Sequence, residues 1–164
     1  MLPKQLQDAI NDQINHELYS AYLYLSMAAH FESENLPGFA HWMIVQYREE
    51  TAHAMKFFKY IHDRNGVVSL KAIDQPPTKF ESPLKVFEQV LKHEQKVSGL
   101  INKLYELALK HKDYPSQVIL QWFITEQVEE EKNDLDIIHQ LTAAGNTPTA
   151  IMLIDRHLAT RAAG

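Results

Sequence analysis

Residues 66–82 read GVVSLKAIDQPPTKFES, and this stretch decides the fold because it separates two pairs of long helical segments. Apolar residues recur every three or four positions on both sides of it, which predicts amphipathic helices near residues 4–33, 38–65, 83–111 and 114–144. A helix of about 28 residues is roughly 42 Å long, whereas an extended connector of about 17 residues reaches about 56 Å. The connector can therefore run the full length of a bundle, and the pair Pro76-Pro77 favours an extended chain.

The other connections are short, so helices one and two, and helices three and four, are predicted to form antiparallel hairpins. Ser82, Asp113 and Thr147 stand at expected N-caps, each close to a proline that suits a first helical turn. Gly99, inside the third helix, indicates a close helix–helix approach. We predict an all-α fold over a single domain, residues 1–164. It is a four-helix bundle with one long crossover between helices two and three, plus a short fifth C-terminal helix near residues 148–161.

Composition excludes several classes of function. The chain has 164 residues, a net charge of −5 and no cysteine. Disulfide scaffolds, iron–sulfur clusters, thiolate zinc sites and covalently attached haem are therefore excluded. The negative charge argues against nucleic acid as a partner and favours a cation as the charged ligand. No apolar run approaches the roughly 20 residues of a membrane span, and the first ten residues do not read as a signal peptide, so we expect a cytoplasmic protein without a membrane partner.

Carboxylates interrupt the apolar stripes at inward positions. Each long helix carries one near its middle: Glu17, Glu50, Glu94 and Glu130. An isolated carboxylate in an apolar core costs several kcal/mol unless something compensates it. One misphased stripe could leave one glutamate on the rim, but four at comparable depth argue against that explanation. No Lys or Arg falls on these inward positions, so the remaining partner is a metal cation.

The run Glu50-Thr51-Ala52-His53 makes the prediction of a metal site more specific. Residues three apart share a helix face, so the carboxylate of Glu50 and the imidazole of His53 can converge on one ion. Oxygen-rich ligation with one imidazole and no sulfur suits iron, manganese or another borderline divalent ion. The number of carboxylates allows two metals bridged by Glu50. Zinc would use fewer carboxylates.

At these residues the sequence resembles the bacterial non-haem ferritins, over essentially its full length. The resemblance rests on Glu17, the run from Glu49 to His53, Glu94, and the stretch from Trp122 to Glu130. It implies a di-iron centre in which Glu17, Glu50 and His53 hold the first iron. Glu50, Glu94 and Glu130 hold the second.

The resemblance implies further residues around this centre. A third iron site corresponds to Glu49, Glu126, Glu129 and Glu130. Gln127 matches a glutamine beside the ligands, and Tyr24, seven residues after Glu17 and so on the same face, matches a tyrosine beside the di-iron centre. Tyr24 either acts on the iron, through a hydrogen bond or an electron, or is a core tyrosine with a satisfied hydroxyl. Haem is not expected, because Thr51 stands where haem-containing bacterioferritins have a methionine and helix four lacks a second Glu-x-x-His.

The function that the resemblance implies is iron storage with ferroxidase activity. Fe²⁺ would be oxidised to Fe³⁺ by O₂ or H₂O₂, and the ferric mineral would be kept inside a hollow cage of 24 identical subunits. The apolar connector residues Val67, Val68 and Leu70 and the apolar fifth helix offer surface for burial between subunits. Two alternatives remain open: a di-iron oxygenase acting on an organic substrate, and a metal-binding bundle without catalysis.

Overall fold

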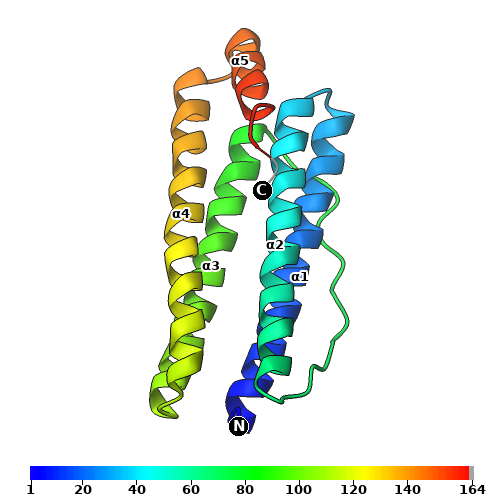
Figure 1. The fold of residues 1–164 in the computed structure, drawn as a ribbon. Helices are drawn as coiled ribbons and strands as arrows, with labels where there is room; N and C mark the ends of the chain where they lie inside the picture. Colours follow the sequence, from blue (N-terminus) through cyan, green and yellow to red (C-terminus); the bar gives the residue numbers. More distant parts are fainter. Residues whose placement is uncertain (163–164) are drawn as a thin grey trace.

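The computed structural model describes residues 1–162, which form a bundle of long helices with a shorter helix across one end (Figure 1). The helices are α1 (Lys4–Ser33), α2 (Pro37–Asp63), α3 (Pro83–Lys110), α4 (Tyr114–Ala144) and α5 (Pro148–Leu158). Helix α1 packs against α2, and α3 against α4, while α1 also contacts α3. This architecture confirms the predicted fold class. Helix α2 ends at Asp63 rather than at residue 65, and α5 ends at Leu158 rather than at residue 161.

Side chains cap two of the helices as their sequences indicate. The Ser82 hydroxyl accepts from the Lys85 amide at 3.4 Å, and the Asp113 carboxylate accepts from the Ser116 amide at 3.1 Å. Thr147 takes the N-cap position of α5 but makes no such side-chain bond. The prediction for Gly99 was wrong, because a Cβ at this position would meet nothing within 4 Å.

The crossover between α2 and α3 runs along α1 (Figure 1). Asn11 holds its first part: the side-chain amide donates to the Val67 carbonyl at 3.0 Å and accepts from the Ser69 amide at 2.8 Å. Further along, the Ser26 hydroxyl donates to the Pro77 carbonyl at 2.6 Å. The connector is therefore fixed against the bundle by bonds to its backbone, which leaves the apolar side chains of Val67 and Leu70 exposed.

The core consists of two apolar clusters, one toward each end of the bundle. One cluster is built around Phe31, Phe39 and Phe87, and the other around Phe57 and Phe123, whose rings stack at 3.9 Å between centroids. On each long helix, a polar stretch separates the residues of the two clusters. The sequence thus places a polar layer across the middle of an otherwise apolar bundle.

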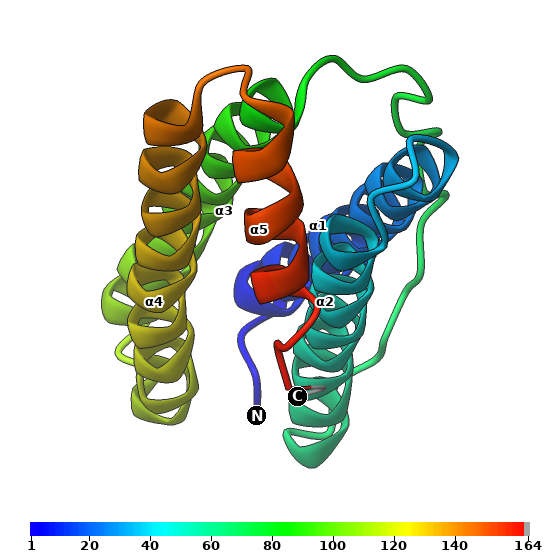
Figure 2. The same ribbon diagram turned by 90° about the horizontal axis from the view of Figure 1, so that it is seen from above.

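Helix α5 lies across the end of the bundle and contacts α2 and α4 (Figure 2). It buries Ile154 and Leu158 against the nearer apolar cluster. Within residues 1–162, no helix is both long enough and apolar enough to cross a membrane.

Candidate metal centre

The polar layer contains the four inward glutamates and one histidine, all buried. Their exposed fractions are 1% for Glu17, 1% for Glu50, 5% for His53, 0% for Glu94 and 3% for Glu130. We call these five residues the carboxylate layer. Each long helix contributes at least one of them, so the layer is assembled by the packing of the bundle rather than by a local loop.

Three members of the layer converge on one point. Glu17, Glu50 and His53 each offer a ligand atom, and these atoms all lie within 4.8 Å of one another. The Nδ1 atom of His53 is 3.6 Å from Oε2 of Glu50, whereas Oε1 of Glu50 is buried with no hydrogen-bond partner in the described part of the chain. Gln13 orients Glu17 by donating to its Oε1 at 2.9 Å. A buried carboxylate oxygen without a partner is the position that a cation would satisfy.

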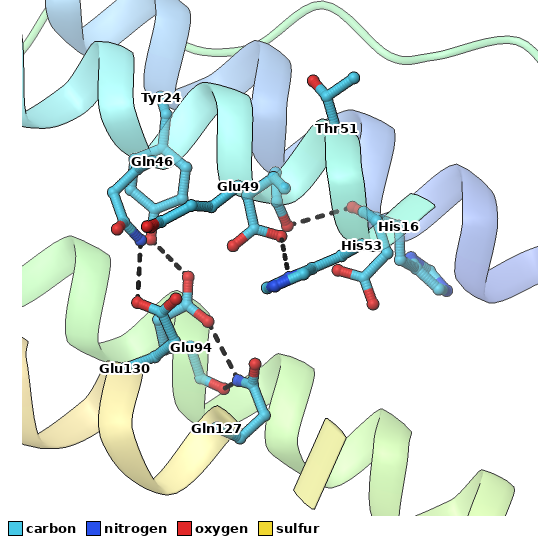
Figure 3. A network of polar contacts seen from close by, with 12 residues as sticks. His16, Tyr24, Gln46, Glu49, Thr51, His53, Glu94, Gln127 and Glu130 are labelled. Carbon is cyan, nitrogen blue, oxygen red and sulfur yellow. Dashed lines mark hydrogen bonds and ion pairs between the residues drawn. The ribbon is translucent and has the colours of Figure 1, made fainter. Parts of the chain in front are cut away.

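Glu94 and Glu130 lie across the bundle, on α3 and α4 (Figure 3). The Tyr24 hydroxyl donates to Glu94, and the Gln127 side-chain amide donates to Oε2 of the same carboxylate at 3.0 Å. Gln46 donates to Oε2 of Glu130 at 3.0 Å. Neutral side chains therefore hold both carboxyl groups in place without supplying a positive charge.

Burial dominates the electrostatics of the layer. It raises the pKa of Glu17 to about 7 and that of Glu130 to about 8, and in Glu130 the charge of Glu94 adds to the effect. Burial also raises the pKa of Glu50 well above its usual range, reinforced by the charges of Glu94 and Glu17. The pKa of His53 is lowered to about 4, first by burial and then by Lys56. The imidazole is therefore neutral at pH 7, as a metal ligand must be.

No Lys or Arg within residues 1–162 forms an ion pair with any glutamate of the layer. The raised pKa values mean that the empty layer holds protons near neutral pH, which a metal must displace. Protons rather than basic side chains therefore neutralise the layer until a metal ion replaces them.

Glu49, Glu126 and Glu129 lie nearer to the surface, and we call them the outer cluster. Burial raises the pKa of Glu49, and the charges of Glu126 and Glu129 raise it further, whereas Arg161 lowers it. Arg161 donates to Oε2 of Glu49 at 2.7 Å. This ion pair could not be predicted from helix periodicity, which placed no basic residue near the layer.

Three further polar residues, which were not predicted as part of the site, lie beside it. Gln13 and Gln46 orient Glu17 and Glu130, as described above. Asp134, one turn beyond Glu130 on α4, is 0% exposed, and neither of its carboxylate oxygens has a partner in the described structure. Its pKa is raised to about 9 by burial and by the charges of Glu94 and Glu130. Gln46 and Asp134 both stand on the inward stripes of their helices, which is the signal that could have included them.

Comparison with known proteins identifies the family. The ferritin-like domain family matches residues 7–144. A bacterial non-heme ferritin of Bacteroides fragilis is 43% identical over 161 residues, which cover 98% of this chain and 100% of the relative. A bacterial non-heme ferritin of Staphylococcus aureus is 40% identical over 161 residues, covering 98% of this chain and 97% of the relative.

Solved structures agree with these relatives. A ferritin of Archaeoglobus fulgidus, engineered into a closed form, superimposes with a TM-score of 0.98 at 44% identity, covering 100% of both chains. A structure described as a novel open pore ferritin of the same archaeon gives a TM-score of 0.97 at 45% identity, covering 98% of each chain. Sequence and fold agree over nearly the whole length, and this chain belongs to the ferritin family.

Proposed function

We propose that this ferritin is a ferroxidase that oxidises Fe²⁺ within the bundle and stores the ferric product as a mineral. The observation that carries the proposal is the carboxylate layer itself. It holds four buried glutamates, one from each long helix, and they form no ion pair with Lys or Arg within residues 1–162. Such a layer lowers the stability of the empty protein, and a bound cation is what compensates for it.

The layer offers positions for two irons as substrates. Glu17, Glu50 and His53 hold the first, which is supported by their mutual approach within 4.8 Å. We propose that Glu50 also binds the second iron, which Glu94 and Glu130 hold from the opposite helices; the charge interactions of Glu50 with both carboxylates support this. Tyr24 and Gln127 fix the Glu94 carboxylate, so Tyr24 acts here by positioning a ligand.

Oxidation of two irons together supplies an electron pair. Each Fe²⁺ loses one electron, and two electrons with two protons reduce O₂ to H₂O₂; with H₂O₂ as the oxidant, they yield two water molecules. Negatively charged oxygen ligands favour Fe³⁺ over Fe²⁺, so the layer makes the irons better reductants. The protons that metal binding displaces from the glutamates are released at the same place.

We also propose a third cation, held by the outer cluster together with Glu130. Glu49, Glu126 and Glu129 are less buried than the carboxylate layer, and their mutual repulsion supports a cation there. Storage requires a cage, and we propose that this chain assembles into 24 copies in the cytoplasm.

Stopped-flow absorbance after mixing metal-free protein with Fe²⁺ in air tests the proposal. We expect Glu50→Ala and His53→Ala to lose the fast oxidation phase while the assembly keeps its mass. Glu106→Ala, which removes an exposed glutamate of α3, is the matched control and should oxidise Fe²⁺ like the wild type. Wild-type rates in Glu50→Ala would place the oxidation elsewhere.

The product distinguishes the alternative functions. Oxidation of many irons per subunit into a soluble mineral identifies storage. Turnover that depends on an organic substrate would identify an oxygenase, and the absence of both would leave a metal-binding bundle.

A further inference from the structure

The C-terminal segment, residues 159–161, is brought onto α2 by a bond that caps the start of that helix. Asp155 of α5 accepts from the backbone amides of Gly38 and Phe39, at 2.8 and 3.0 Å. A Cβ on residue 38 would lie 1.7 Å from the Asp155 carbonyl oxygen, so only glycine permits this approach. Helix α5 is therefore docked at a defined position, and the chain that follows it is directed along α2.

Arg161 then contacts three successive turns of α2. Its carbonyl accepts from Nε2 of His41 at 2.8 Å, and its guanidinium lies 4.6 Å above the ring of Trp42. One terminal nitrogen, Nη2, donates both to Gln46 and to Oε2 of Glu49, the latter at 2.7 Å. The other, Nη1, is buried with no partner in the described residues. The guanidinium is therefore held mainly by its ion pair with Glu49 and by its contact with the Trp42 ring, because Nη1 makes no hydrogen bond within the described residues.

These contacts connect Arg161 with both parts of the site. Glu49 belongs to the outer cluster. Gln46 accepts from Arg161 and donates to Glu130 of the carboxylate layer at 3.0 Å. Within residues 1–162, Arg161 forms the only ion pair of Glu49. The guanidinium thus occupies Oε2 of Glu49, an atom that a metal ion bound to this carboxylate could use.

We propose that Arg161 is a built-in counter-cation that competes with the third metal ion for Glu49. When the third position fills, the guanidinium leaves Glu49, so the docking of α5 sets how readily that position is occupied. This inference rests on the proposed function, because it assumes the third position at the outer cluster. Both members of the pair are partly exposed, at 21% and 28%, so the ion pair is weak enough for a divalent ion to displace.

Calorimetric titration of the metal-free assembly with Zn²⁺, which is not oxidised, tests the competition. We expect Arg161→Gln to leave the tight binding class unchanged and to strengthen the weaker class about threefold, since Zn²⁺ no longer competes with a guanidinium for one carboxylate. Arg156→Gln removes the same charge from an exposed position of α5 and is the matched control, with wild-type binding expected. Gly38→Ala displaces the docked helix and should reproduce the effect of Arg161→Gln.

Displacement itself has a separate readout. The chain has two tryptophans, so a Trp122→Phe background leaves Trp42, under the guanidinium, as the only one. The emission of Trp42 should change when Zn²⁺ fills the weaker class, and this change should be absent in Arg161→Gln. An emission that does not respond to Zn²⁺ would show that the guanidinium stays in place.

The titrations separate this inference from the proposed function. A weaker class that is unchanged in Arg161→Gln, or equally strengthened in Arg156→Gln, would leave the proposed function standing and overturn the role of Arg161. A weaker class that appears only in Arg161→Gln would support it. Loss of the proposed function would instead be shown by a tight class that survives Glu50→Ala.

Discussion

Asp134 makes the metal-free protein less stable as the pH rises, and its removal should show this. The carboxyl is buried without a hydrogen-bond partner in the described structure, and its pKa is raised to about 9 from an ordinary value of 3.8. Between these two values the folded chain keeps the proton, whereas the unfolded chain loses it. The unfolded state therefore binds fewer protons, and the free energy of unfolding falls with rising pH. Asp134→Asn has nearly the same shape but no proton to lose.

The size of the effect follows from the slope of the free energy of unfolding against pH. One group that is protonated in the folded state and ionised in the unfolded state changes the free energy of unfolding by about 1.4 kcal/mol per pH unit. Over the two units from pH 6 to pH 8, the advantage of Asp134→Asn over the wild type should grow by about 2–3 kcal/mol. The other raised glutamates are present in both proteins, so the comparison reports the pH dependence that Asp134 adds, including its coupling to Glu94 and Glu130.

Guanidinium chloride unfolding of the chelator-treated assembly, at equal protein concentration, measures this difference at both pH values. Asp136→Asn is the matched control, because Asp136 is exposed on the same helix and pairs with Lys132 at 3.0 Å. Its effect should stay within about 0.5 kcal/mol at both pH values. An advantage of Asp134→Asn that is equal at pH 6 and pH 8, or smaller at pH 8, would refute the reasoning, since the carboxylate would then be ionised and paired in the folded state.

Two further variants test the outer cluster and the junction of α2 with α4. Glu49→Ala combined with Glu126→Ala should keep the initial oxidation of two irons and change the number of irons oxidised per O₂; complete loss of the initial phase would show that these glutamates belong to the inner site. Asp113→Asn should lower the free energy of unfolding at pH 7 by about 2 kcal/mol, because it loses the paired bonds with Arg64 at 2.8 Å. Arg64 lowers the pKa of Asp113, so this contribution is present above the ordinary value and is lost as the pH falls through the lowered one, which acid unfolding of both proteins measures.

Most of the bundle could be predicted from the sequence because its signals are local. The 3.6-residue period indicates which side of a helix is buried. The connector of residues 66–82 is long enough to return along the whole bundle, so helices two and three can run parallel to each other. The same period places Glu17, Glu50, Glu94 and Glu130 inward at similar heights. Gly99 shows the limit of local inference: the residue type suggested a close approach, yet the space around it is open, and only the packing of α3 decides this.

The positions of the basic and neutral side chains around the carboxylates could not be predicted in this way, because they depend on contacts between distant parts of the chain. Arg161 follows the end of α5, so no helix period relates it to Glu49, 112 residues earlier. Its position depends on Asp155 capping α2 and on Gly38 leaving room for that cap. For Asp134, the helix period predicts the inward position, but only the packed core shows that no hydrogen-bond donor of the described residues reaches its carboxylate. Helix phase therefore predicts where a carboxylate points, whereas the packing of the whole chain decides whether a proton, an arginine or a metal ion compensates its charge.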